Sequence, residues 1–250
     1  MGHLSNQLAY FASFDRKRRW DWQKDPFIAQ REQEPLRPLI EELERRTRVG
    51  RVRVLESGCG DGLNVMHVRQ HIAPDRFTWT GVDITPEAVA FAQSQQIDAS
   101  LGDGCKLMFP DASFDIVYCR DVFHHLENTE QQKAFFAEMW RVTAPGGIVF
   151  AIEPNPLNPA MCGLAALVSA ERGLFSIAER RMNRLFPGAI IQCVSASSAW
   201  RIWLHYFSPF LHSANRVYIE KAIQAWERFC QRLAPKLFWS YRVYIWHKSS

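Results

Sequence analysis

Residues 51–63 read RVRVLESGCGDGL, and this stretch decides the fold. Its first six residues have the alternating pattern of a β-strand, and glycines at positions 58, 60 and 62 form a turn behind it. A helical pattern follows from about Leu63 to Gln70. Glycines between a strand and a helix allow positive φ angles, and they let backbone N–H groups approach a ligand at the helix N-terminus. The stretch therefore predicts the first β-turn-α unit of an α/β fold.

The alternation of strand and helix continues to about residue 155. We predict the other strands of this region over Phe77–Asp83, Ala99–Leu101, Phe114–Cys119 and Ile148–Ile152. Helices are predicted between them, the longest over Glu127–Val142, and Pro145–Gly147 is expected to turn the chain into the fifth strand. Five strands separated by helices favour a doubly wound, mainly parallel sheet that is covered on both faces.

Prolines at positions 154, 156 and 159 end this pattern, because proline cannot continue a central strand or a helix interior. Beyond them we predict helical lid segments over 157–187 and 199–234, and strands over Ala189–Val194 and Leu237–Trp246. Residues 1–50 are helix-prone and are predicted to form an N-terminal helical cap on a main domain over 51–250.

Composition fits one globular domain of ordinary size. The chain has 250 residues, of which 47% are apolar and 22% charged, and these shares exclude a disordered or fibrous protein. The net charge of +4 is too small to indicate a nucleic-acid binder. Its distribution is uneven, because residues 157–250 hold 12 basic and 4 acidic side chains. This late segment therefore either packs against the acidic core or faces an anionic substrate or lipid headgroups.

Cysteine spacing gives no sign of a metal or disulfide framework. The six cysteines form no CxxC pair, and no histidine lies at zinc-ligand spacing, so we expect no metal. The longest strongly apolar run, 160–170, is far shorter than the ~20 residues of a membrane-spanning helix. The first residues lack the pattern of a signal peptide, and we expect a cytoplasmic protein.

Several motifs together resemble those of the class I S-adenosylmethionine-dependent methyltransferases. The turn 56–62, ESGCGDG, is similar to the first motif of that family, and Leu63 stands where a dinucleotide-binding fingerprint would have its third glycine. The stretch FDIVYCRDVFHHLEN over 114–128 resembles the fourth motif, and WRVTAPGG over 140–147 resembles the helix end before the fifth strand. The resemblance covers about Arg51 to Asn155.

The resemblance implies a seven-stranded sheet, in which Ala189–Val194 is the sixth strand and Leu237–Trp246 is the seventh, inserted antiparallel between the fifth and sixth. It also implies S-adenosyl-L-methionine as cofactor. Glu56 would face the methionyl ammonium, Asp83 the ribose hydroxyls and Asp103 the adenine amino group, while Arg120 would act mainly through its backbone carbonyl. The full set of residues expected at the cofactor is Glu56, Gly58, Gly60, Asp83, Ile84, Asp103, Gly104 and Arg120. Asp83 could instead cap the helix that begins at Pro86, and Asp103 could be a turn residue.

Positioning dominates the expected catalysis. Correct placement can supply ~7–11 kcal/mol, whereas a general base supplies ~10²–10⁴-fold in rate. The base candidates are His125 and His124, which follow the fourth strand, and Glu153, at the end of the fifth. Each histidine could equally be a structural residue that backbone groups satisfy.

The sequence thus predicts methyl transfer to a small organic acceptor, with a hydroxyl or phenol oxygen as the favoured atom and carbon or nitrogen acceptors left open. The aromatic, basic late segment suggests an apolar or aromatic acceptor that carries a carboxylate or phosphate, with peripheral membrane contact as a further option. The alternatives are a protein or nucleic-acid methyltransferase, although the segment after the fourth strand disfavours base methylation, and a non-catalytic S-adenosylmethionine-binding scaffold. A nicotinamide oxidoreductase is a more distant alternative. The sequence gives no oligomeric state.

Overall fold

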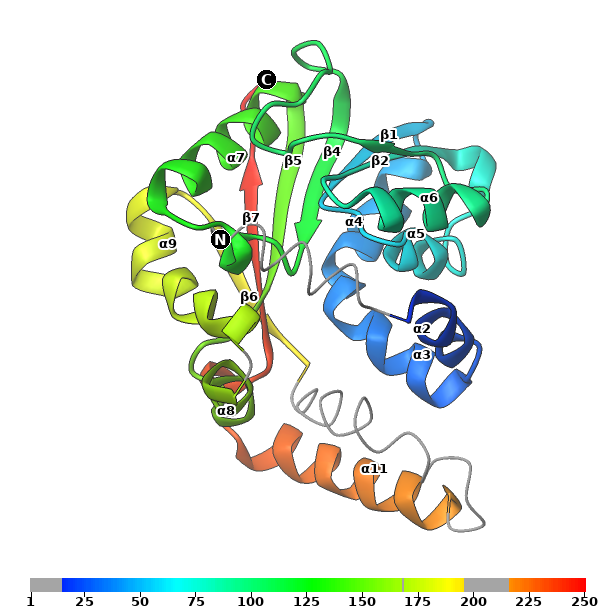
Figure 1. The fold of residues 1–250 in the computed structure, drawn as a ribbon, viewed down its shortest axis with the longest axis vertical. Helices are drawn as coiled ribbons and strands as arrows, with labels where there is room; N and C mark the ends of the chain where they lie inside the picture. Colours follow the sequence, from blue (N-terminus) through cyan, green and yellow to red (C-terminus); the bar gives the residue numbers. More distant parts are fainter. Residues whose placement is uncertain (1–14, 168, 196–215) are drawn as a thin grey trace.

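A computed structural model describes residues 15–167, 169–195 and 216–250. Its described strands form one seven-stranded sheet of order β3-β2-β1-β4-β5-β7-β6 (Figure 1). The strands are β1 (Val52–Ser57), β2 (Phe77–Asp83), β3 (Ala99–Leu101), β4 (Phe114–Arg120), β5 (Thr143–Pro154), β6 (Ile190–Val194) and β7 (Tyr241–His247). The predicted α/β class and mainly parallel sheet are confirmed.

Helices connect the strands and cover the sheet (Figure 1). The α-helices are α2 (Arg16–Gln23), α3 (Pro26–Gln33), α4 (Arg37–Thr47), α5 (Leu63–Val68), α6 (Pro86–Ser94), α7 (Thr129–Val142), α8 (Pro159–Leu167), α9 (Glu179–Leu185) and α11 (Arg216–Leu233). Short 3₁₀ helices are η1 (Glu34–Leu36), η2 (Pro74–Arg76), η3 (Phe123–His125), η4 (Ser169–Ile177) and η5 (Lys236–Phe238). Local chemistry sets several starts: the Asn128 side chain accepts a hydrogen bond from Gln131 N at the beginning of α7, and Pro86 is the first residue of α6.

Strand order reverses at β1. Val54 of β1 pairs in parallel with Trp79 of β2 on one side and with Ile116 of β4 on the other. The chain therefore leaves the middle of the sheet in two directions, and a crevice for ligands forms at the carboxyl ends of strands on either side of such a point.

The last strand completes the other half of the sheet. β7 is antiparallel to both of its neighbours, with Ile245 opposite Phe150 of β5 on one side and Ile190 of β6 on the other. The expected antiparallel insertion of the final strand between the fifth and sixth is confirmed.

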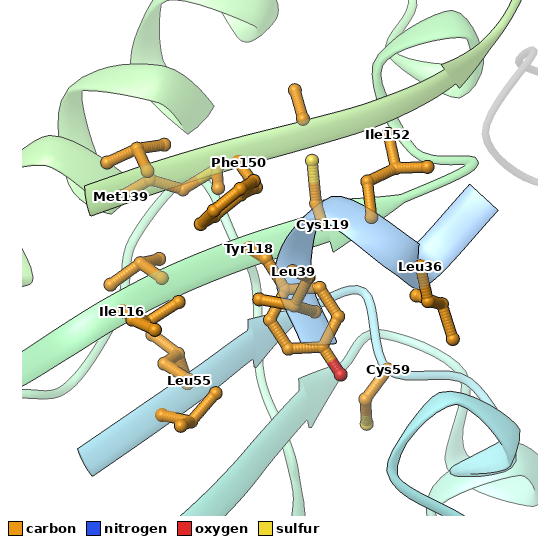
Figure 2. Packing of buried hydrophobic residues seen from close by; sticks show 14 of the residues in the cluster. Leu36, Leu39, Leu55, Cys59, Ile116, Tyr118, Cys119, Met139, Phe150 and Ile152 are labelled. Atoms are coloured by element: carbon orange, nitrogen blue, oxygen red, sulfur yellow. The ribbon is translucent and has the colours of Figure 1, made fainter. Parts of the chain in front are cut away.

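Both faces of the central strands are buried. Tyr118 and Cys119 are neighbours in β4 and point to opposite faces, yet neither is exposed to solvent. Figure 2 shows Leu39 of α4 packed beside Tyr118, with Ile116 further along the same strand and Phe150 on the neighbouring β5. A hydrophobic layer on each side therefore fixes the sheet, and its carboxyl edge becomes a rigid platform for side chains.

Two predicted boundaries are wrong. The fifth strand begins at Thr143 rather than Ile148, because Phe114 pairs with Thr143 and Ile116 with Ile148, so the expected turn is an irregularity within β5, with Gly146 at φ +72°. The last strand begins at Tyr241 rather than Leu237, because η5 occupies the residues after Pro235.

Much of the predicted lid is helical. The first lid segment holds α8, η4 and α9, and α11 occupies the second half of the other segment. Residues 199–215 of that segment, and 1–14 of the predicted cap, lie outside the described residues.

Candidate functional site

The glycine turn after β1 lies at the centre of the carboxyl edge. Gly58, Gly60 and Gly62 all have positive φ, between +53° and +82°. A Cβ on Gly58 would overlap Val122 at 2.4 Å, and one on Gly62 would overlap Ile97 at 2.5 Å. A Cβ on Gly60 would meet nothing within 4 Å. Two of the glycines are therefore required for packing, while the middle one leaves bare backbone beside open space.

Asp83 fixes this turn from the end of β2. Its Oδ2 accepts a hydrogen bond from Gly60 N at 2.7 Å, and its Oδ1 accepts one from Thr85 N at 2.8 Å. The side chain remains partly exposed, and an ionised carboxylate offers about four acceptor positions. Asp83 therefore does not cap α6 itself, whose N-cap residue is Thr85, but holds the turn just before it, and its contact with ribose hydroxyls stays a prediction. Ile84 beside it is exposed.

The loop after β3 carries Asp103 and Gly104. Asp103 is exposed, and its Oδ1 accepts a hydrogen bond from Cys105 N at 2.8 Å, so the residue shapes its own turn. A Cβ on Gly104 would lie 2.3 Å from the ring of Phe135 and 2.7 Å from Ser57 Oγ. Gly104 therefore has a packing role, and its contact with a cofactor stays a prediction, as does that of Asp103.

Glu56 is fully buried beneath the turn. Tyr118 donates its hydroxyl to Glu56 Oε2 at 2.7 Å, and Asn64 donates its amide to Oε1. Burial raises the pKa of Glu56 to about 8, and the two hydrogen bonds and Arg120 only partly offset this effect. A carboxyl group with this pKa is poised to ionise when a cation arrives beside it.

Arg120 links this carboxyl group to the N-terminal helices. Its Nη1 donates to Asn64 Oδ1 at 2.9 Å and to Glu32 O at 3.1 Å, and its Nη2 lies 3.3 Å from Glu32 Oε2. The side chain is buried, although we expected Arg120 to act mainly through its backbone. The sequence did not point to Asn64 or Glu32, because no local pattern shows that α3 packs above the end of β4.

The N-terminal helices also close over the glycine turn. Trp20 donates its indole N–H to Asp61 O at 3.2 Å, and Arg19 lies 3.3 Å from Asp61 Oδ2. Helix α2 therefore contacts the glycine turn and α3 contacts Arg120, so both helices lie against the carboxyl edge of the sheet.

His124 and Glu153 meet, but in a buried cluster. Glu153 Oε1 accepts hydrogen bonds from Val122 N at 2.9 Å and Phe123 N at 2.8 Å, and its Oε2 lies 2.7 Å from His124 Nδ1. A Cβ on Gly173 of η4 would overlap the carbonyl oxygen of His124, so this helix packs directly against the loop. These contacts favour structural roles for both residues, which hold the loop after β4.

His125 differs from its neighbour. It is only partly buried, and its ring lies 3.9 Å from that of His124 between centroids. Of the three base candidates, it is the one with access to solvent.

The carboxyl edge contains a further pair that the sequence analysis missed. Tyr241 donates its hydroxyl to Asp121 Oδ2 at 3.2 Å, and Asp121 has the strained φ of +58°. Ser195, at the end of β6, has φ +62° and donates to Glu34 Oε2 at 2.7 Å. Because β7 lies between β5 and β6, it brings Tyr241 beside residues that are far away in sequence. The only local signal was the position of Asp121 directly after β4.

Two other kinds of site are absent from the part of the chain that the structure describes. No three histidine, cysteine or acidic side chains there are grouped as metal ligands. Among the same residues, no helix has the length and apolar character needed to cross a membrane.

Comparison with known proteins finds similarity to methyltransferases. Residues 55–151 match the family described as a methyltransferase domain. A probable S-adenosylmethionine-dependent methyltransferase of Mycolicibacterium smegmatis is 33% identical over 118 residues, which are 42% of this chain and 43% of that protein. A demethylmenaquinone methyltransferase of Deinococcus radiodurans is 29% identical over 143 residues, 50% of this chain and 57% of that protein. The chain thus spans about half the length of these relatives.

Solved structures agree on the fold. The [4+2]-cyclase SpnF covers 85% of this chain and 80% of its own, with a TM-score of 0.55 and 20% identity. The phosphoethanolamine N-methyltransferase 2 of Haemonchus contortus has a TM-score of 0.55 and 16% identity, and the match covers 85% of this chain and 53% of the other. Residues 55–151 thus resemble a methyltransferase domain, and the solved structures share the fold of the chain.

Proposed function

We propose that this protein transfers a methyl group from S-adenosylmethionine to a small organic acceptor. The observation that carries the proposal is the carboxyl edge around β1, where the glycine turn has bare backbone at Gly60, is held by the partly exposed Asp83, and lies above the buried Glu56. A fold alone can serve many reactions, so these residues and the match to a methyltransferase domain, rather than the fold, support this function.

These residues fit the cofactor. Gly60 leaves room for a ligand against the backbone, Asp83 has acceptor positions for vicinal hydroxyls, and Glu56 can ionise to meet an ammonium group. Ile84 offers an exposed apolar surface next to Asp83, and Asp103 remains the proposed acceptor for an amino group. When bound, S-adenosylmethionine supplies a methyl group that its sulfonium makes electrophilic.

The protein's own task is to orient the acceptor and exclude water. Helices α2 and α3 cover the crevice through Asp61 and Arg120, and a closed site strengthens electrostatic interactions inside it. His125 is the proposed base, because its side chain is partly exposed. His124 is buried, and its Nδ1 already contacts Glu153. We propose a hydroxyl or phenol as the methylated group, and a base would remove the proton that this oxygen must lose.

The relatives support a small acceptor. Their names include demethylmenaquinone methyltransferase, norajmaline N-methyltransferase and 2-methyl-6-phytyl-1,4-hydroquinone methyltransferase, and each of these names a small organic molecule. For this chain we propose an apolar or aromatic acceptor on the same basis.

Substitution of Asp83 tests the cofactor site. Asp83→Ala should weaken binding of S-adenosylmethionine by about 2–3 kcal/mol in calorimetry, because charge-assisted hydrogen bonds to two hydroxyls are lost. Asp83 also holds Gly60 and Thr85, so the thermal midpoint of each variant is measured in parallel, with Glu87→Ala as an exposed control on the same helix start. Unchanged affinity in the folded Asp83→Ala variant contradicts the assignment.

Turnover separates the enzyme from a scaffold. The wild-type chain should form S-adenosylhomocysteine when it is incubated with S-adenosylmethionine and a panel of phenols, hydroquinones and amines. Tight cofactor binding with no product from any acceptor, together with capture of a partner protein, supports the scaffold instead. Product formed only with RNA, DNA or a protein supports the other alternative, and binding there should weaken with salt.

A further inference from the structure

Helix α11 has one face that is held against the protein. Glu227 receives two hydrogen bonds from the Arg31 guanidinium, each 2.7 Å long, and Arg216 lies 2.7 Å from Asp25 Oδ2. Cys230 on the same face is buried. These contacts join α11 to α3 and to the residue that caps it, so the orientation of the helix about its own axis is fixed.

Another face of α11 presents large apolar side chains to solvent. Tyr218, Trp226, Phe229 and Leu233 are 73%, 56%, 53% and 66% exposed. At 100° per residue these four side chains lie within one sector of the helix, and we call them the aromatic stripe. Trp226 and Phe229 stack on each other with centroids 5.5 Å apart, and Leu237 and Phe238 extend the apolar surface beyond the helix end.

A third sector of the helix is basic. Lys221, Arg228 and Arg232 are exposed and lie next to the aromatic stripe, on the side away from the face that contacts α3. The two acidic residues of the helix are in ion pairs within the protein, Glu220 with Arg216 and Glu227 with Arg31. The solvent-facing surface of α11 therefore combines aromatic side chains with positive charge.

This combination fits an anionic lipid surface. Tryptophan, phenylalanine and leucine can enter the boundary between headgroups and acyl chains, while neighbouring lysines and arginines attract the headgroups. A second copy of the chain would bring three like charges against three like charges, which opposes self-association. We propose that α11 docks on a membrane that contains anionic lipids, with the aromatic stripe at headgroup level.

The position of α11 gives the docking a direction. Figure 1 shows the helix, in orange, as the outermost element beyond the end toward which β4 and β5 run. The proposed acceptor site lies at the same carboxyl edge, and α3 contacts both α11 and Arg120. Docking would hold that edge near the lipid surface and favour an apolar acceptor drawn from it; this last step rests on the proposed function, whereas the docking does not.

Vesicle co-sedimentation of the full chain tests the docking without cofactor or turnover. The wild-type protein should bind vesicles of equal parts phosphatidylcholine and phosphatidylglycerol, and bind vesicles of phosphatidylcholine alone far more weakly. The double variant Trp226→Ser, Phe229→Ser should bind these vesicles with an affinity at least about tenfold lower, because two apolar side chains no longer enter the interface. A triple variant with Lys221→Gln, Arg228→Gln and Arg232→Gln should bind anionic vesicles more weakly at low salt, by about fivefold for each charge removed.

Matched variants remove the same chemistry elsewhere on the exposed surface. Val49→Ser with Met108→Ser removes two exposed apolar side chains, and Arg48→Gln, Arg51→Gln and Arg69→Gln remove three exposed charges. Both controls should bind vesicles like the wild type. The proposal is overturned if the controls lose binding equally or if the wild-type chain does not bind. It is also overturned if sedimentation shows a dimer that is absent only in the variant of Trp226 and Phe229.

Discussion

Glu56 is a glutamate whose ordinary pKa of 4.5 is raised by burial to about 8. Between those two values the folded protein holds a proton that the unfolded chain has lost. Stability should therefore fall as the pH rises through this window, by about 3–5 kcal/mol at most. In Glu56→Gln the neutral amide should remove most of this slope, as measured by urea unfolding from about pH 5 to about pH 9. Exposed Glu44→Gln is the control, and a Glu56→Gln variant that keeps the wild-type slope contradicts the assignment.

The proton on the Glu56 carboxyl group should also make cofactor binding depend on pH. If an ammonium group binds beside Glu56, the carboxyl must ionise, so the affinity should rise with pH and level off above about pH 8. Calorimetry in buffers of different ionisation enthalpy should detect proton release. The Glu56→Gln variant should show neither effect.

The two adjacent histidines should separate in their effects. His125→Ala should leave cofactor affinity unchanged and slow turnover of a phenolic acceptor by about 10²-fold or more, because the proposed base is lost. His124→Ala should act mainly on thermal stability, because it removes the contact of 2.7 Å with buried Glu153. A His125 variant that loses stability while it keeps full turnover makes that residue structural.

At the scale of the element, the glycine turn offers a matched pair of substitutions. Gly62→Ala places a Cβ 2.5 Å from Ile97 in a residue with φ +80°, and it should cost about 2–4 kcal/mol of stability in chemical denaturation. Gly60→Ala adds only the backbone strain, about 1–2 kcal/mol, and should instead weaken cofactor binding because its Cβ occupies open space. Equal losses of stability with no change in binding would contradict this division.

The sequence predicted those parts of the site that depend on one element and its turn. The glycines at 58, 60 and 62 and the strand-end position of Asp83 follow from local pattern, and the structure places them at one edge. Tyr241 beside Asp121 could not be found in this way, because their contact depends on the insertion of β7. The burial of Arg120 depends on α3 in the same manner, since Glu32 and Asn64 meet it from separate parts of the chain.

The predicted start of the fifth strand was wrong for a different reason. The motif Pro145-Gly146-Gly147 has the composition of a turn, yet pairing with β4 continues on both sides of it and absorbs the extra residues as an irregularity. Long-range pairing therefore overrides the local preference of glycine and proline at this position.

At the scale of the whole molecule, β7 joins β6 to the rest of the sheet through β5. A chain that ends at Trp239 should lose cooperative unfolding and aggregate, because β6 loses its partner in the sheet and β5 becomes an exposed edge paired with β4 alone. Removal of Ser249 and Ser250 alone should leave the thermal midpoint within about 1 °C, because β7 ends at His247. Circular dichroism during heating measures both, and a cooperative transition in the shorter chain would contradict the prediction.

The order of these strands also determines when each of them can pair during synthesis of the chain. In the sheet that the described residues form, β6 has no neighbour except β7, and β7 is made last. A nascent chain on the ribosome can assemble β1 to β5 early, but β6 has no partner in this sheet until β7 leaves the exit tunnel. The release of β7 from the ribosome, rather than the folding of β1 to β5, is then the step that completes this sheet.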